Sequence, residues 1–156
     1  MNFTIREAQE SDLPDIVSLW SAFMEMLPQI NNNYWDVKDG RQAFQKYLKF
    51  SLEKQDVLVT LAENETDNLV GFSLSLIEEL PEWFGSEKIG LIRYQAVAAK
   101  FHGKGVGQAM TDFIFSWFRK RNIRRVELYV LEGLAASDYW LKIGFKTFMD
   151  RRFIII

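Results

Sequence analysis

The sequence predicts an α/β protein in which a mixed β-sheet carries helices on both faces. Strand-like segments alternate with segments of helical period along the chain. Segments 57–63 and 69–77 are strand-like and are separated by a short polar turn, which is typical of an antiparallel hairpin. A glycine-rich turn joins a further strand, 88–98, to a helix that begins near residue 106. Because hairpins give antiparallel pairs and strand–helix–strand units give parallel pairs, the sheet is expected to contain both.

The N-terminal third is expected to contain one strand and two helices. Residues 3–7 form the strand, and a helix follows Ser11, a residue type that often caps helix N-termini. The apolar residues of this helix recur at the spacing of one helical face: Leu13, Ile16, Val17, Trp20, Phe23, Met24 and Leu27. Pro28 is expected to end the helix. Residues 28–38 are polar and aperiodic, which predicts a loop, and a second helix is expected over 39–53.

The helix after the glycine turn has the clearest pattern in the chain. Its apolar residues form one stripe: Val106, Met110, Phe113, Ile114 and Trp117. Beyond it we expect a strand at 126–130, a short helix at 134–142, and closing strands at 145–149 and 152–156. The expected order is therefore strand, helix, helix, three strands, helix, strand, helix and two strands. At 156 residues the chain is expected to form a single domain over residues 1–156.

Composition excludes several classes of protein and of site. The apolar content of 48% and the aromatic content of 15% exclude a disordered chain. With 19 basic and 21 acidic residues the net charge is −2, so no overall positive field attracts nucleic acid. The absence of cysteine and the single histidine exclude disulfides and a Cys/His zinc site, and no metal is expected. Neither a signal peptide nor an apolar run of membrane-spanning length is found, so we expect a cytoplasmic protein without a membrane partner.

The turn over residues 97–108 is the strongest candidate for a ligand site. Its alternate glycines stand where a helix begins, and the unpaired N–H groups of a helix N-terminus carry partial positive charge that suits a phosphate. Two familiar phosphate loops do not fit. A dinucleotide-binding fingerprint needs glycine where Gln108 stands, and a P-loop needs serine or threonine where Gly105 follows Lys104. A plain glycine turn that binds nothing is the alternative.

The turn resembles the acyl-CoA loop of the GNAT superfamily of N-acetyltransferases, whose pattern is Val-x-x-x-x-Arg/Gln-Gly-x-Gly-x-Gly/Ala. Val97, Gly103, Gly105 and Gly107 match this pattern, and His102 occupies the Arg/Gln position. The order of elements is similar to the GNAT order over essentially the whole chain. This resemblance implies acetyl-CoA as co-substrate, with its pyrophosphate on backbone amides of the turn and its pantetheine arm along the preceding strand. The coenzyme-binding residues it implies are Ala96, Val97, Ala98, Ala99, His102, Gly103, Lys104, Gly105, Val106, Gly107 and Gln108.

A second stretch, residues 136–145, resembles the family pattern Ala-x-x-Phe-Tyr-x-Lys-x-Gly-Phe. Trp140 stands where many members carry the tyrosine that protonates the departing CoA thiolate, and Gly133 stands where many carry an asparagine. An indole cannot act as a general acid, so Trp140 is expected to bind the coenzyme by packing on pantetheine. Tyr139 is the remaining candidate for a catalytic tyrosine, although it is expected to point about 100° away around the helix. Water can also protonate a thiolate, so a tyrosine is not required.

The resemblance further implies that the Val97 N–H faces the thioester carbonyl and that the amine attacks it directly. An alkylammonium group with a pKa of about 10 must first lose a proton, and Glu79, followed by Glu78, is the candidate base. The residues expected to contact the acceptor are Tyr34, Trp35, Glu78, Trp83 and Tyr94. Acidic side chains beside aromatic rings suit a cationic amine. The alternative is a solvated hairpin in which Trp83 and Phe84 cap the core.

The sequence therefore predicts a GNAT-fold N-acetyltransferase that moves acetyl from acetyl-CoA to a primary amine, with a small molecule favoured over a protein. A catalytically silent acyl-CoA-binding module and an α/β domain whose turn binds nothing are the alternatives. The C-terminal stretch, 152–156, is apolar and β-prone. It is expected to pair within the sheet or to contribute to a homodimer.

Overall fold

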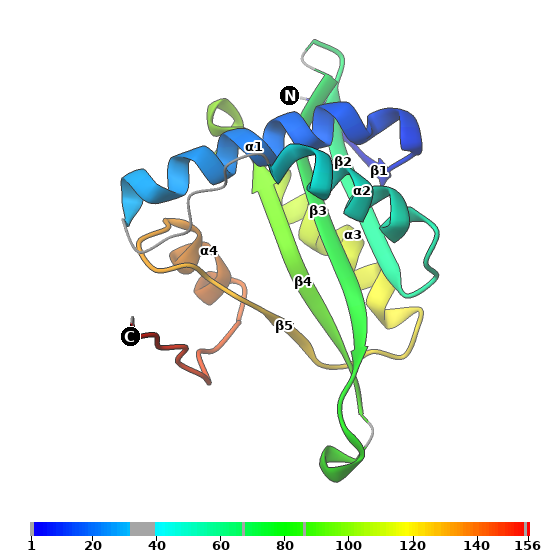
Figure 1. Ribbon diagram of the computed structural model, residues 1–156. Coiled ribbons are helices and arrows are strands. Elements are labelled where there is room, and N and C mark those ends of the chain that lie inside the picture. The colour runs from blue at the N-terminus through cyan, green and yellow to red at the C-terminus, as the bar shows by residue number, and fades with distance from the viewer. Residues whose placement is uncertain (1, 32–39, 67, 86, 155) are drawn as a thin grey trace.

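The computed structural model describes residues 2–31, 40–66, 68–85, 87–154 and 156, and it is built around one five-stranded sheet (Figure 1). The strands are β1 (Thr4–Glu7), β2 (Val57–Asn64), β3 (Asn68–Glu79), β4 (Lys88–Val97) and β5 (Val126–Leu128). They lie side by side in chain order, with β1 to β4 antiparallel and β5 parallel to β4. The predicted mixed sheet is confirmed.

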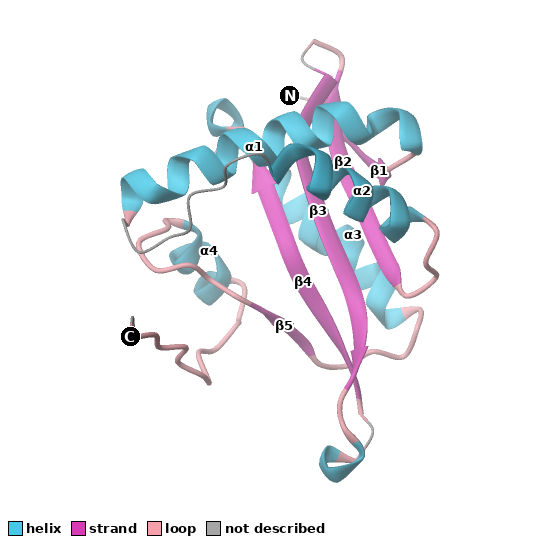
Figure 2. Ribbon diagram, in the orientation of Figure 1, coloured by secondary structure: helices cyan, strands magenta, loops and turns pink. Residues whose placement is uncertain are grey.

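The described residues form four α-helices around the sheet. They are α1 (Leu13–Ile30), α2 (Gly40–Leu52), α3 (Val106–Arg119) and α4 (Ala136–Lys142). The helices α1 and α2 lie on one face and α3 lies on the other, while α4 lies beyond β4 on the side of β5 (Figures 1 and 2). Short 3-10 turns precede α1, interrupt the β3–β4 connection and follow β4. In the described part of the chain, no helix combines the length and the apolar character needed to span a membrane.

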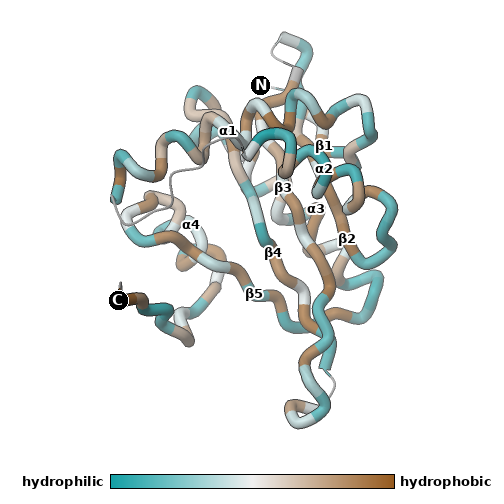
Figure 3. The backbone as a smooth tube through the Cα atoms, in the orientation of Figure 1, coloured by the Kyte–Doolittle hydropathy of each residue, from teal (hydrophilic) through white to brown (hydrophobic). Residues whose placement is uncertain are grey.

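The core forms on both faces of the sheet because each helix buries one apolar stripe. On the first face, Trp20 of α1 stacks on Phe44 of α2 with ring centroids 4.2 Å apart. On the second face, the stripe predicted for α3 is confirmed: four of its members are buried and Phe113 is partly buried. Hydrophobic residues are concentrated in the strands, whereas the turn between β2 and β3 is hydrophilic (Figure 3).

The predicted boundaries of α1 are wrong at both ends. Ser11 is not the N-cap, because Asp12 bonds the Gln9 N–H at 2.7 Å and closes a 3-10 turn, so the α-helix begins at Leu13. Pro28 lies inside the helix, which continues to Ile30. A proline in the last turn forgoes one intrahelical bond, and the helix closes beyond it, because the Asn31 N–H donates to Leu27 O at 3.1 Å.

The two predicted closing strands are absent from the described residues after α4. Phe145 packs against Phe115 and Trp140, and the Arg125 guanidinium lies 5.2 Å from the centre of the Phe148 ring. These contacts hold side chains but form no strand ladder, and β5 itself ends at residue 128 rather than 130. High β-propensity alone therefore did not produce strands here, because pairing needs a partner of matching length.

Candidate coenzyme site

β4 separates from β5 halfway along its length. The two strands pair through Gly90, Leu91 and Ile92, so the rest of β4 has no strand partner on that side among the described residues. Against β3, Leu74 is paired with Tyr94 and the next residue is paired with Ile92, which leaves Arg93 as an extra residue in a β-bulge. A bulge bends its strand and increases the local twist. The second half of β4 is therefore an open edge.

The backbone groups on this open edge belong to Gln95 and Val97. The Ala98 N–H donates to Val70 O at 2.9 Å, so Ala98 faces β3. Because the backbone groups of successive strand residues face opposite sides, Ala96 also faces β3, whereas Gln95 and Val97 face away from it. An added Cβ on Gly71 of β3 would lie 3.0 Å from Ala96 O, which agrees with this direction. The resemblance implied that the backbone groups of Ala96, Val97 and Ala98 bond pantetheine, and of these Val97 is the one that presents its backbone to the open edge.

The glycine turn places a row of free amides at the start of α3. In the described structure the N–H groups of Gly103, Gly105, Val106, Gly107 and Gln108 donate to no backbone carbonyl. Gly105 is the N-cap, with φ of 84°, and Gly103 has φ of 72°, so both occupy the left-handed region that favours glycine. A Cβ added at either position would meet no atom within 4 Å. The first turn of α3 holds no acidic side chain. This arrangement fits the diphosphate of a coenzyme.

His102 and Lys104 border the same turn. The His102 ring nitrogen Nε2 lies 2.8 Å from Val97 O, so the side chain ties the turn to the end of β4. The backbone N–H groups of His102 and Lys104 donate to Ala99 O at 3.1 Å and to Phe101 O at 3.3 Å, so these two predicted phosphate-binding amides serve the turn itself. Lys104 Nζ lies 5.4 Å from the centre of the Phe101 ring, which keeps its positive charge beside the turn.

A hydrogen-bond network joins β4, α3 and α4 behind the turn. Gln95 Nε2 donates to Gly107 O at 3.1 Å and to Thr111 Oγ1 at 3.2 Å. Thr111 Oγ1 donates to Gly107 O at 2.9 Å and lies 2.8 Å from the Tyr139 hydroxyl. Either oxygen can be the donor in the bond between Tyr139 and Thr111, and Thr111 Oγ1 also lies 3.5 Å from Gln95 Oε1. The Tyr139 hydroxyl is thereby bonded inside the network. Burial raises the pKa of Tyr139 above the ordinary value of 10.0, so the phenol stays neutral at pH 7.

Tyr139→Phe is therefore expected to change turnover by less than about threefold and to lower the free energy of unfolding by about 1 kcal/mol, the typical value of one hydrogen bond. Because the folded-state pKa is raised, the contribution of the neutral phenol is fully present below pH 10 and is lost as the pH rises through the folded value. Kinetics at pH 7 and urea unfolding between pH 7 and pH 11 check both statements. Tyr129→Phe is the matched control, since that ring is 69% exposed. A hundredfold loss of turnover without loss of stability would instead make Tyr139 the proton donor.

Trp140 lies in the core rather than at an open surface. It is 7% exposed and packs with Trp117, Phe118 and Phe145. The packing on pantetheine predicted for it requires an accessible ring face, which this arrangement does not provide. The separation of about 100° between adjacent helical residues is as expected. The directions of the two side chains are the reverse of those expected, however. Tyr139 points toward α3 and the β4 edge, and Trp140 points into the core.

The structure does not bring Glu79 and Trp83 to the open edge of β4. Glu79 is exposed and pairs with Lys88, nine residues before Val97 and so about 30 Å away along the strand. Trp83 is 81% exposed and belongs to the short 3-10 turn Glu82–Phe84 between β3 and β4, which lies at the bottom of Figure 1. The reason is topological, because an antiparallel hairpin lies at the opposite end of β4 from the glycine turn. Phe84 is also exposed, so the pair does not cap the core.

The remaining acceptor residues have different positions. Tyr34 and Trp35 lie outside the described residues. Tyr94 is half-buried next to the bulge, 5.5 Å from Phe44 between ring centroids, and burial raises its pKa. Glu78 is partly exposed on β3. Sequence reasoning missed Gln95 and Thr111, although strand alternation from Val97 and helical spacing from Gly107 both point to them. No group of three or more His, Asp or Glu side chains that could hold a metal occurs in the described chain.

The fold and the turn together define the class: an α/β domain with an open strand edge beside a helix N-terminus whose amides are free. The model of the "Acetyltransferase (GNAT) family" matches residues 18–145. The chain belongs to this family. The resemblance inferred from the glycine turn is thereby confirmed.

Relatives of known sequence and structure agree with this assignment. The chain is 31% identical over 86 residues to mycothiol acetyltransferase from Renibacterium salmoninarum, a match that covers 54% of this chain and 25% of that protein. The chain thus spans about a quarter of that curated relative.

Solved structures show the same fold at low identity. The tetramutant of the BH1408 protein from Bacillus halodurans has a TM-score of 0.85 at 16% identity, covering 98% of this chain and 99% of that one. A predicted acetyltransferase from Clostridium acetobutylicum, crystallised with acetyl-CoA, has a TM-score of 0.76 at 16% identity, covering 99% and 96%. Glucosamine-6-phosphate N-acetyltransferase from Arabidopsis thaliana has a TM-score of 0.71 at 18% identity, covering 99% of both chains.

Proposed function

We propose that the protein is an N-acetyltransferase that moves the acetyl group of acetyl-CoA to a primary amine, in a single domain comprising residues 1–156. The observation that carries this proposal is the juxtaposition of free amides at residues 103 and 105–108 with the open edge of β4. A diphosphate and an extended amide-containing arm are the two parts of coenzyme A that such a site suits. Membership of the acetyltransferase family supports the same reaction.

In this proposal the chain's own groups bind and orient both substrates. The amides of the glycine turn hold the diphosphate, and the backbone groups of Gln95 pair with the pantetheine arm. Acetyl-CoA supplies an acetyl group activated as a thioester. The Val97 N–H lies on the same edge and donates to the thioester carbonyl oxygen, where negative charge develops during attack.

Proton transfer in this proposal runs through water. The amine must lose a proton before attack, and Glu79 lies too far along β4 to accept it directly. The Tyr139 hydroxyl is bonded to Thr111 Oγ1 in the network behind the turn. The departing thiolate is a weak base and takes its proton from solvent.

The type of acceptor, the cellular compartment and the oligomeric state are also part of the proposal. The acceptor in this proposal is a small molecule bound beside the bulge at Arg93, where Tyr94 is half-buried. The enzyme works in the cytoplasm. A homodimer would cover the C-terminal apolar side chains Phe153, Ile154 and Ile156, which are 68%, 83% and 111% exposed.

Release of free CoA thiol from acetyl-CoA over a panel of amines, aminoglycosides and peptides tests the proposal. Amine-dependent release together with an N-acetylated product supports it. If no amine is acetylated, calorimetry with acetyl-CoA distinguishes the two alternative functions. Binding without turnover would identify a silent acyl-CoA-binding module, and no binding would show that the turn serves the fold alone.

A further inference from the structure

The bulge in β4 brings two consecutive side chains to one face of the sheet. Ile92 packs in the core cluster with α3, whereas Tyr94 packs in the cluster with α1 and α2. Arg93 Nη1 donates to the Tyr47 hydroxyl of α2 at 3.1 Å, so Arg93 shares the face of Tyr94. A regular strand would send these neighbours to opposite faces. The bulge thus adds a cation to the face next to the open edge.

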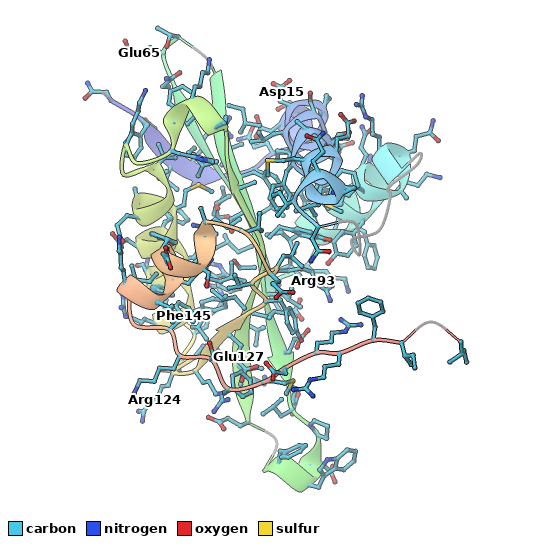
Figure 4. All side chains as sticks on the ribbon, turned by 90° about the vertical axis from the view of Figure 1, so that its left-hand side faces the viewer. Asp15, Glu65, Arg93, Arg124, Glu127 and Phe145 are labelled. Atoms are coloured by element: carbon cyan, nitrogen blue, oxygen red, sulfur yellow. The ribbon has the colours of Figure 1, made fainter. Side chains whose placement is uncertain are left out.

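Arg93 keeps most of its hydrogen-bonding capacity. A guanidinium has five N–H donors, and the bond to Tyr47 uses one of them. Across the described chain no carboxylate lies within ion-pair distance of Arg93, whereas Arg6, Arg41 and Arg125 each pair with an acid. The side chain is exposed and lies on β4 between α1 and the C-terminal segment in the view of Figure 4. The Tyr47 hydroxyl fixes its direction.

Arg93 also lies on the same strand as Val97, whose N–H faces the reacting carbonyl in the proposed function. It precedes Val97 by four positions, or about 13 Å between Cα atoms, part of which its long side chain can span. The hydrogen bond to Tyr47 raises the pKa of Arg93, and the negative charge of Glu78 on the adjacent strand adds a smaller contribution in the same direction. Among the described residues this face therefore presents a cation without an ion-paired carboxylate, which suits an acceptor that carries an oxyanion.

We propose that Arg93 binds an oxyanion of the acceptor, a carboxylate or a phosphate, so that the substrate class is a primary amine with a negatively charged group. This inference rests on the proposed acetyl transfer. A guanidinium binds a carboxylate or a phosphate through paired N–H···O bonds, and a neutral acceptor cannot form those bonds.

Matched acceptor pairs test this inference by thiol release: glycine against glycinamide, phosphoethanolamine against ethanolamine, and glucosamine 6-phosphate against glucosamine. At least one anionic member is expected to exceed its neutral partner in kcat/KM. Arg93→Ala is expected to lower kcat/KM for that acceptor by about 10- to 100-fold, mainly through KM, since charge-assisted bonds are lost. The neutral partner and the KM for acetyl-CoA should not change. Arg93→Lys should restore part of the loss.

Arg41→Ala is the matched control, since Arg41 is an exposed arginine on α2 paired with Glu25. Equal losses for the anionic and neutral members in Arg93→Ala, or a uniform preference for neutral members, would overturn the inference. Calorimetric binding of the anionic members to the CoA-saturated protein gives a readout independent of turnover. Binding that Arg93→Ala abolishes supports the inference even if transfer fails, and the lack of any such binding overturns it even if neutral amines are acetylated.

Discussion

Replacing Gly105 with glutamate is expected to abolish measurable binding of acetyl-CoA while the protein stays folded. Gly105 is the N-cap of α3, and a Cβ at this position points into open space in front of the free amides. A carboxylate there would compete with the diphosphate for the N–H groups and repel its charge. Two unit charges 4 Å apart repel by about 1 kcal/mol in water and about 4 kcal/mol near a protein surface. With direct competition added, we expect the affinity to fall by about a hundredfold or more.

Any side chain at position 105 strains the backbone, so the binding experiment needs a control for this strain. Its φ of 84° costs a residue with a side chain about 1–2 kcal/mol. Gly85 has φ of 86° and open space around it, at the far end of β4. Gly85→Glu therefore reproduces the strain and the charge without entering the turn, and Gly105→Ala reproduces the strain alone. Isothermal titration with acetyl-CoA should show near-normal affinity in Gly85→Glu and at most a modest loss in Gly105→Ala. Normal affinity in Gly105→Glu would refute the placement of the diphosphate.

Replacing Trp140 with alanine is expected to lower the free energy of unfolding by about 3–5 kcal/mol. The indole is 7% exposed and fills the space between α3 and α4, in contact with Phe145 at 5.3 Å between ring centroids. Its removal leaves a large cavity, since a short helix cannot easily collapse onto α3. The same substitution at Trp83, which is 81% exposed, should change stability by less than about 0.5 kcal/mol.

Stability and coenzyme affinity separate the two roles considered for Trp140. Trp140→Phe keeps an apolar ring and should leave the protein folded, so its KM for acetyl-CoA can be measured alongside chemical denaturation. A core role predicts a stability loss with little change in KM. A rise of tenfold or more in KM with unchanged stability would show that the ring packs on the coenzyme after all.

The parts of the fold predicted correctly are those fixed by local pattern. The buried stripe of α3 and the β2–β3 hairpin follow from periodicity and turn chemistry, which depend on neighbours in sequence. The glycine turn was predicted because the left-handed φ at Gly105 favours glycine, and glycines can be read directly from the sequence. These features do not need knowledge of how distant segments pair.

The errors concern features that depend on pairing between segments. The bulge at Arg93 exists because of the register between β3 and β4, so it cannot be predicted from the residue types in the sequence. Glu79 was assigned to the site from the end of its strand, but antiparallel pairing places that end away from the turn. Tyr139 and Trp140 were separated correctly in angle, yet the direction of each depends on how α4 packs on α3. The closing strands failed for the same reason, since residues 145–149 have apolar contacts but no ladder.

A crystal structure of the protein with acetyl-CoA tests the central claim most directly. We predict diphosphate oxygens within hydrogen-bonding distance of the amides of Gly103, Gly105 and Val106 to Gln108, and the pantetheine arm along Gln95 and Val97. A coenzyme bound elsewhere, or a glycine turn without phosphate at saturating acetyl-CoA, would contradict the account.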